Sequence, residues 1–322
     1  MVTLTPGTDS PRVLVAGAIY ADTIFAGLTR LPQAGEEVVA EEVGWAPGGY
    51  AISALAFHRL EMSTELLGEV GDDFYGRALL SLFDSEGLST NRVYQAKGGH
   101  TNVAVTLNWS GDRGIVSYGR VPLAPWEWYA EALEEAGSKA ILYLAARHPY
   151  AHRLVKLARR LGQEVALSLS WQPDFLRSWE LRDLLPLAQL LFCNVPEALM
   201  VTQETHIEAA GERLAASVPE VVITRGSEGA DVLHDGRRES TAARPVVLVD
   251  VTGAGDVFSS TYVATRSWGW PFLERLRAAN WAAGHAIGRI GGGTGSPRKA
   301  TLLEGLATAR SAATAAGLGR RD

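Results

Sequence analysis

The sequence predicts an α/β fold in which a mainly parallel central sheet lies between two layers of helices. The first observation is an alternation of strand-like and helical patterns from about residue 125 onward. Strand patterns cover 139–145 and 164–170, and helical patterns cover 150–161 and 175–185. Such alternation indicates parallel strands joined by helices that pack on both faces of the sheet. The second observation is composition, since 322 residues with 47% hydrophobic and 20% charged side chains can bury a large core.

Charge and cysteine content exclude several classes of protein. The formal net charge is −6 and the chain has only four lysines, which argues against nucleic acid as the main partner. Cys193 is the single cysteine, so no internal disulfide can form, and this suits a reducing compartment. Residues 1–12 are polar, and no apolar run approaches the length of a membrane span. We therefore expect a cytoplasmic protein that does not insert into membranes.

The first strand is expected at residues 13–17, a short apolar run. Asp22 follows close on the end of this strand. In open α/β sheets ligands gather beyond the carboxyl ends of the strands, so Asp22 is a candidate binding residue. An Asp at such a place is equally often a simple turn residue.

An exposed or edge strand is predicted over residues 36–45, where hydrophobic side chains alternate weakly. The pair Gly48 and Gly49 then breaks the chain before a helix over 50–60. Glycines before a helix can form a plain turn, and they can also let a ligand approach the backbone closely.

The next strand is expected at residues 64–70, followed by a Gly-Asp-Asp sequence in which Asp72 or Asp73 caps a helix. Residues 100–119 alternate between apolar and polar side chains on either side of a turn cluster at 110–114. This pattern predicts a β-hairpin outside the main alternation of strands and helices.

Two later strands end in polar residues. The strand at 190–193 runs into Asn194-Val-Pro-Glu197, which is a complete helix start by itself, with Pro in the first turn and an acidic residue beside it. The strand at 220–224 runs into a turn that contains Gly226 and Gly229. Two glycines three residues apart are weak evidence for any ligand.

Residues 250–258, Asp-Val-Thr-Gly-Ala-Gly-Asp-Val-Phe, are the stretch on which the functional prediction depends. The apolar run 245–249 before them predicts a strand, and the helical spacing after them predicts a helix. A nearly side-chain-free turn before a helix N-terminus suits a phosphate group. Asp256 at this helix start is either a plain N-terminal cap or a reactive carboxylate. The chain contains no Gly-Lys dipeptide, so a Walker A loop is excluded, and the glycine spacing does not match a dinucleotide fingerprint.

The 250–258 stretch resembles the C-terminal motif of the ribokinase-like (PfkB) carbohydrate kinases, and further matching elements occur in order over about residues 11–310. The resemblance implies a three-layer ribokinase-like fold and transfer of the γ-phosphate of ATP to a hydroxyl of a sugar or sugar derivative. It implies that Asp256 is the general base and that the glycine turn forms the anion hole. The residues of that turn are Gly253, Ala254 and Gly255.

The resemblance also implies how the acceptor is held. Asp22 and the backbone of Gly48 and Gly49 match positions that bind the sugar. The Asn that follows the glycine pair in relatives is missing, and Ile52 or Ser53 takes its place. This departure puts ordinary pentose or hexose specificity in doubt.

The cofactors implied by the resemblance are ATP and Mg²⁺, with K⁺ in those relatives that a monovalent cation activates. Glu197 would hold magnesium through water, since Mg²⁺ keeps several waters and needs few protein carboxylates. The ATP-binding residues would be Asn194, Thr224, Gly226, Gly229 and Asn280. The monovalent cation would be held by Asp250, Ile287, Gly292 and Ser296.

The resemblance implies a single domain over residues 11–310, with tails at 1–10 and 311–322. Stretches at about 20–47 and 98–120 would form a small β-sheet lid over the acceptor, and a lid excludes water from phosphoryl transfer. In relatives the other face of the lid often forms a dimer contact, so we expect a homodimer through the lid.

Two other functions are consistent with the sequence. A nucleoside kinase, with an adenosine- or pseudouridine-type acceptor, would use Trp45 or Tyr50 to stack on the base, although either aromatic could instead belong to the core of the lid. A nucleotide-binding regulator without turnover would not need Asp256 or Glu197, and both are present.

Overall fold

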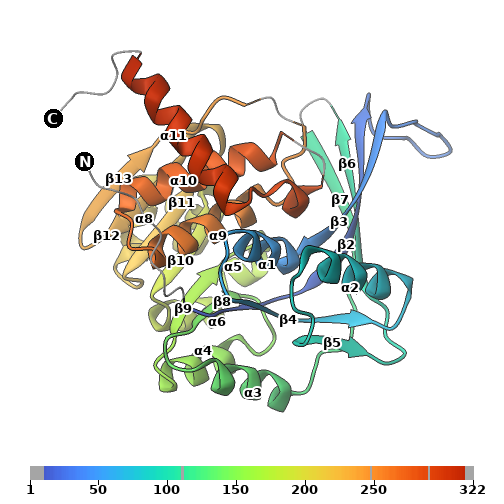
Figure 1. Ribbon diagram of the computed structural model, residues 1–322, viewed down its shortest axis with the longest axis horizontal. Helices are drawn as coiled ribbons and strands as arrows, with labels where there is room; N and C mark the ends of the chain where they lie inside the picture. Colours follow the sequence, from blue (N-terminus) through green and yellow to red (C-terminus); the bar gives the residue numbers. More distant parts are fainter. Residues whose placement is uncertain (1–10, 110–111, 247–248, 289–290, 316–322) are drawn as a thin grey trace.

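The chain is described by a computed structural model that covers residues 11–109, 112–246, 249–288 and 291–315 (Figure 1). A nine-stranded sheet forms the middle layer. Its neighbouring strands are parallel except at one edge, where the final two strands of the chain pair antiparallel. In sheet order these strands are β13 (Arg237–Thr241), β12 (Ala230–His234), β11 (Glu220–Thr224), β10 (Leu190–Asn194), β9 (Glu164–Ser168), β8 (Ile141–Ala145), β1 (Val13–Ala16), β4 (Thr64–Gly71) and β5 (Val93–Ala96). The predicted α/β class with a mainly parallel sheet is confirmed.

Helices cover both faces of this sheet. One face carries α1 (Tyr50–Arg59), α2 (Phe74–Glu86), α9 (Ala254–Ser267), α10 (Phe272–Ala286) and α11 (Lys299–Ala315). The other carries α3 (Trp126–Ala136), α4 (Ala151–Arg160), α5 (Pro173–Leu176), α6 (Trp179–Leu184), α7 (Val195–Thr202) and α8 (Ile207–Ala215). Three short 3₁₀ turns are η1 (Leu185–Leu187), η2 (Gly226–Glu228) and η3 (Gly292–Gly295).

The strand β1 shows why the sheet is buried on both faces. Val13 and Val15 belong to the core cluster on the face of α1 and α9, whereas Leu14 and Ala16 belong to the cluster on the face of α3 and α4. Successive side chains of a strand point to opposite faces, so an uninterrupted apolar run must be covered twice. Complete burial of each large aliphatic side chain contributes about 1.5–3 kcal/mol.

A second, smaller sheet stands at one end of the molecule (Figure 1). Its strand order is β3 (Glu42–Gly49), β2 (Ile19–Leu28), β6 (Asn102–Trp109) and β7 (Asp112–Tyr118). The hairpin predicted over 100–119 is the antiparallel pair β6–β7. The strand predicted over 36–45 is shifted, because β3 begins at Glu42 and continues through the glycine pair to Gly49.

Two helix starts illustrate how local sequence sets the elements. Asp73 is the N-cap of α2, since its Oδ1 accepts a hydrogen bond from Gly76 N at 2.9 Å, and this confirms one of the two predicted caps. The helix predicted over 175–185 is instead divided into α5, α6 and η1. The division follows from a new cap at Ser178, whose hydroxyl accepts from Leu181 N at 3.2 Å and starts α6.

The strand predicted over 245–249 is wrong where the structure describes it, since Pro245, Val246 and Val249 lie outside any strand, and residues 247–248 lie outside the described part. The backbone N–H groups of Val249 and Asp250 both donate to Ile287 O, at 2.9 and 3.0 Å. This segment is therefore held by the end of α10 and not by a neighbouring strand. Across the described residues, none of the helices combines the length and apolarity that crossing a bilayer requires.

Candidate active site

The start of α9 presents a carboxylate and a glycine turn together. Gly253 is the N-cap with φ of 75°, a left-handed conformation that favours glycine, and no side chain caps the helix. Asp256 lies in the first turn. Gly255 is exposed, and a Cβ added to it would meet no atom within 4 Å, so an outside group can approach its backbone. These features, together with the positive end of the helix dipole, suit an anion.

A cleft of about 630 Å³ opens in front of this turn. Thr224, which ends β11, lines it together with Gly226 and Gly229 of the turn that follows, and α10 contributes Asn280. Ala254 and Gly255 line the same cleft from α9. The structure therefore brings together four of the residues predicted to bind ATP and two of those predicted for the anion hole. A cleft of this volume is large enough for a nucleotide-sized ligand.

Two of these residues also shape the wall of the cleft. Gly229 has φ of 105°, and a Cβ there would lie 1.9 Å from Thr241 O, so only glycine fits. The Asn280 amide nitrogen donates to the carbonyls of Thr241 and Ala242, at 3.5 and 3.4 Å. The turn after β11 and the chain leaving β13 are thus held against each other beside α10.

Further residues of the cleft were not predicted from the sequence. They come mainly from the segment after β13 and from the facing sides of α9 and α10, and they are Ser227, Ala243, Arg244, Pro245, Val246, Val251, Phe258, Ala283 and Gly284. The strand-like pattern of the run 245–249 gives no sign that Pro245 and Val246 line a cleft. The packing of Val246 against Gly284, where a Cβ would lie 3.2 Å from its side chain, depends on tertiary structure alone.

On the other side of the turn, the small sheet holds the predicted acceptor residues. Asp22 on β2 lies opposite Ala46 on β3, and its carboxylate contacts Gly48, where an added Cβ would be 2.2 Å from both carboxylate oxygens. Asp22 is buried, and its Oδ1 has no hydrogen-bond partner among the described residues. A buried acceptor atom of this kind needs a donor, which a ligand hydroxyl would supply.

The charge state of Asp22 depends on two other carboxylates. Burial, and then the negative charges of Asp250 and Asp256, raise the pKa of Asp22 to about 7. The predicted acceptor residue and the predicted base therefore influence each other electrostatically. Gly49 completes the turn with φ of 60°, and a Cβ there would lie 2.3 Å from Ala18 O.

Asn194 and Glu197 form a reciprocal capping box at the start of α7. Asn194 Oδ1 accepts from Glu197 N, and Glu197 Oε2 accepts from Asn194 N, each at 2.9 Å. Glu197 is buried, and burial raises its pKa. A nearby cation would offset that cost, so one amide and one carboxylate held rigidly here fit a hydrated magnesium ion. Within the described ranges, no three His, Cys, Asp or Glu side chains are grouped as metal ligands, so most ligands of such an ion would be water and phosphate oxygens.

The residues predicted to bind a monovalent cation also lie together, but protein donors engage their oxygens. Asp250 accepts from Thr252 N and Gly291 N, at 2.9 and 3.2 Å. Ile287 O accepts the two N–H groups described above, and Ser296 Oγ accepts from Arg59 at 3.3 Å. Gly292 begins η3 beside them. These hydrogen bonds hold three of the four residues in place, and a monovalent cation at this position stays a prediction.

Ser53 and Ile52, the two candidates for the place of the missing Asn, lie in different surroundings. Its hydroxyl donates to Asp256 Oδ1 at 3.2 Å, whereas Ile52 is packed into the core cluster around α1. Of these two residues Ser53 therefore faces Asp256, because α1 turns it toward α9.

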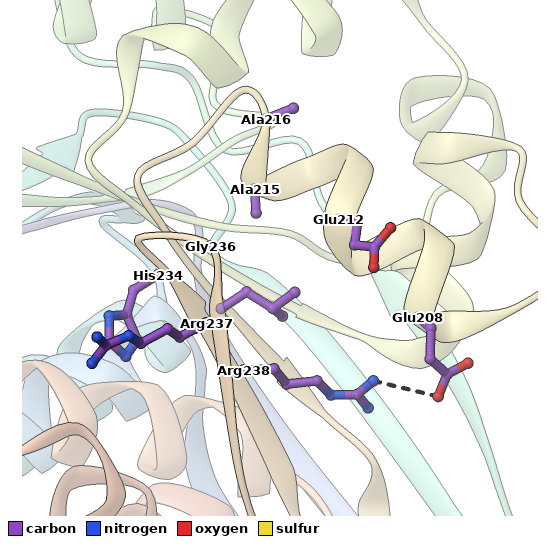
Figure 2. A pocket seen from close by; sticks show the side chains of 9 residues that line it. Glu208, Glu212, Ala215, Ala216, His234, Gly236, Arg237 and Arg238 are labelled. Atoms are coloured by element: carbon purple, nitrogen blue, oxygen red, sulfur yellow. Dashed lines mark hydrogen bonds and ion pairs between the residues drawn. The ribbon is translucent and has the colours of Figure 1, made fainter.

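Another hollow, of about 380 Å³, lies between α8 and the β12–β13 hairpin (Figure 2). Figure 2 shows Arg238 paired with Glu208 there, and Glu212 on the same helix. None of the residues predicted for the active site lines this hollow.

The chain is therefore an α/β protein with a small separate sheet, a nucleotide-sized cleft, and the Asp256 carboxylate at the helix start that lines this cleft. The model of the pfkB family carbohydrate kinases matches residues 11–299, and the chain belongs to this family. A ribokinase of Lactococcus lactis subsp. lactis is 26% identical over 300 residues, which cover 91% of this chain and 97% of the relative.

Two solved structures share the fold. The ribokinase of Arabidopsis thaliana in complex with ribose and ATP superposes with a TM-score of 0.77 at 23% identity, covering 92% of this chain and 98% of that one. The nucleoside kinase of Burkholderia thailandensis in complex with inosine gives a TM-score of 0.74 at 19% identity, covering 94% and 99%. The predicted three-layer ribokinase-like fold with a small separate sheet is confirmed.

Proposed function

We propose that this protein transfers the γ-phosphoryl group of ATP to a hydroxyl of a sugar or sugar derivative. The observation that carries the proposal is the position of the α9 N-terminus. It lines the 630 Å³ cleft and carries Asp256, whose negative charge acts on the buried Asp22 together with that of Asp250. A nucleotide in the cleft would direct its phosphates to the glycine turn, and an acceptor under the small sheet would meet them there.

In the proposed reaction, Asp256 removes the proton of the acceptor hydroxyl as its oxygen attacks the γ-phosphorus. The bond from the γ-phosphorus to the bridging oxygen breaks, and ADP leaves. General-base catalysis of this kind contributes about 10²–10⁴-fold. Backbone N–H groups of the Gly253-Ala254-Gly255 turn would stabilise the developing negative charge, and the loss of one such donor typically costs about 10²–10³-fold.

Magnesium, when bound, would neutralise the charge of the ATP phosphates. Asn194 and Glu197 are the residues that would hold it, through water. Their capping box keeps both side chains in place before any ligand arrives.

The acceptor would be held by Asp22 and by the backbone at Gly48 and Gly49. A nucleoside acceptor is the second candidate, since a structural relative was solved with inosine. The surroundings of Tyr50 favour the sugar, because its ring packs 5.9 Å from that of Tyr143 and its hydroxyl donates to Ser168 O at 3.2 Å. A tyrosine engaged in the core in this way is not free to stack on a base.

The test is the Asp256→Asn variant, which keeps the size of the side chain and removes the base. We expect ATP binding, measured by calorimetry, to stay near the wild-type value while kcat/KM falls by about 10²–10⁴-fold. Asp72→Asn, an exposed aspartate before α2, is the control that should leave both unchanged. Near-normal turnover of Asp256→Asn would reject the assignment of the base. A wild-type protein that binds ATP and releases no ADP with any sugar, sugar acid or nucleoside would be the silent regulator.

We also propose a homodimer through the outer face of the small sheet. Val43, Val116 and Tyr118 are exposed on its strands, and Val103 and Val105 beside them are half-buried. In the register of the sheet these residues alternate with Ala46, Ala104 and Asp22, which face the protein. A largely apolar outer face of this kind suits a contact with a second copy of the chain.

A further inference from the structure

Ser53 joins two helices that come from opposite ends of the chain. It lies on α1, is fully buried, and donates its hydroxyl proton to Asp256 Oδ1 on α9 at 3.2 Å. A second hydrogen bond crosses the same helix pair in the other direction, from Ser260 Oγ to Ser53 O at 3.3 Å. Both ends of Ser53 are therefore anchored to α9, and its backbone cannot shift without disturbing that helix.

The main chain of Asp256 is held by a separate set of contacts. Ser259 Oγ donates to the carbonyls of Gly255 and Asp256, at 2.9 and 3.1 Å. Tyr143 Oη lies 2.6 Å from Ser259 Oγ, in a hydrogen bond that either hydroxyl can donate. Ser259 thus contacts the backbone of this turn, whereas Ser53 contacts the carboxylate itself.

We propose that Ser53 is a positioning residue whose hydroxyl orients the Asp256 carboxylate for proton abstraction, and that it does not bind the acceptor. The inference rests on the proposed function. The side chain of Ser53 is fully buried and directs its one hydroxyl proton at Asp256 Oδ1, so it presents no exposed surface to an acceptor. A hydrogen bond to the ionised carboxylate favours that form, which is the form that accepts a proton.

The experiment compares Ser53→Ala with Ser260→Ala in the full-length protein. Both changes remove a buried hydroxyl from the α1–α9 contact, but only Ser53 touches Asp256. The assay uses saturating Mg-ATP and the acceptor with the highest kcat/KM in a panel of sugars, sugar acids and nucleosides. For Ser53→Ala we expect kcat to fall about 10- to 100-fold, with little change in the KM for the acceptor, since misplacement of about 1 Å costs up to about 10²-fold.

Three further readouts separate positioning from a structural role. The acid limb of the pH–rate profile of Ser53→Ala should move to higher pH, because the carboxylate loses a donor that favours its ionised form. Ser53→Thr keeps the hydroxyl and should recover most of kcat. Ser260→Ala should keep kcat and the pH profile of the wild type, even where its melting temperature falls as much as that of Ser53→Ala.

Several results would overturn the proposal. A higher KM for the acceptor with unchanged kcat in Ser53→Ala would show that Ser53 binds the acceptor. An equal loss of kcat in Ser260→Ala would assign the effect to helix packing. Wild-type kcat and pH profile in Ser53→Ala would reject the positioning role alone, whereas a wild-type protein without turnover on any acceptor would reject the proposed function as well.

Discussion

The carboxylate of Asp22 lies so close to the Cα of Gly48 that no side chain fits between them. A Cβ built on Gly48 would come within 2.2 Å of both carboxylate oxygens, and real Cβ atoms essentially never approach so closely. The absence of a side chain at one residue of β3 therefore decides where the acid on β2 can be.

Gly48→Ala should displace the Asp22 carboxylate without straining the backbone, since the φ of Gly48 is not in the left-handed region. We expect the KM for the acceptor to rise about tenfold or more, because shifts of about 1 Å in a binding group have effects of that size. Steady-state kinetics with varied acceptor measures it. Gly114→Ala, on β7 of the same sheet, is the control, because its φ is not in the left-handed region and its added Cβ would make only ordinary contacts, at 3.4 Å, with Trp109. An unchanged KM in Gly48→Ala would show that Asp22 does not hold the acceptor.

Asp22 should make stability depend on pH in a defined direction. Its pKa in the folded protein is raised to about 7 from 3.8, first by burial and then by Asp250 and Asp256. A raised pKa means that the folded state favours the protonated form, so this contribution to stability is present below about pH 4 and is lost as the pH rises through about 7. The free energy of unfolding of the wild type should therefore fall relative to Asp22→Asn between these pH values, by up to roughly 4 kcal/mol. Urea denaturation of both proteins without ligand measures the difference, and parallel pH curves would contradict it.

The capping box at α7 should contribute to stability independently of any metal. Asn194→Ala removes the acceptor for Glu197 N, and we expect a loss of about 1 kcal/mol in the free energy of unfolding. Asn194→Asp should retain the cap. Ser178→Ala removes the corresponding cap of α6 and is the matched control, since it should lower stability without changing the dependence of rate on magnesium. An equal change in the magnesium dependence of the rate in Ser178→Ala and Asn194→Ala would show that Asn194 has no particular role in holding the metal.

Glu220 should be among the most costly residues to remove. Its buried carboxylate accepts hydrogen bonds from Tyr262 and Arg266 of α9, at 2.6 and 2.8 Å, and from Arg275 of α10 at 3.2 Å. Glu220→Ala leaves two arginines without this partner, and we expect destabilisation of about 3–5 kcal/mol in chemical denaturation. Glu164→Ala removes a half-buried partner of the same Arg266 and should cost about 1 kcal/mol or less. Similar losses in the two variants would contradict the importance of burial.

A charge on the outer face of the small sheet should separate the proposed dimer. Val116 is 70% exposed on β7, and Val116→Glu would place a carboxylate in the contact. We expect sedimentation to show a dimer for the wild type and a monomer for this variant. Val39→Glu, which changes a valine 80% exposed in the loop before β3, should leave the dimer intact. A monomeric wild type would refute the dimer.

Much of the site could be predicted because its residues stand at element boundaries that short patterns reveal. Gly253 and Asp256 lie at a helix start, Asn194 and Glu197 at another, and Asp22 comes soon after the first strand. At such places the residue type is constrained by its immediate neighbours in the chain, through caps, turns and strand ends. The same local signals could not show that Pro245 and Val246 lie outside any strand, since an apolar run resembles a strand whether or not a partner strand exists.

The sequence by itself therefore determined the fold class, the order of the elements and the motif residues, all of which depend on spacing and composition over short distances. Only the tertiary structure decided that Ser53 and not Ile52 faces Asp256, that Asp22 rests on Gly48, and that Glu220 joins α9 and α10 to the sheet. The physical reason is separation along the chain. Ser53 and Asp256 are 203 residues apart, and their meeting depends on how two helices pack against one sheet, which no local pattern records.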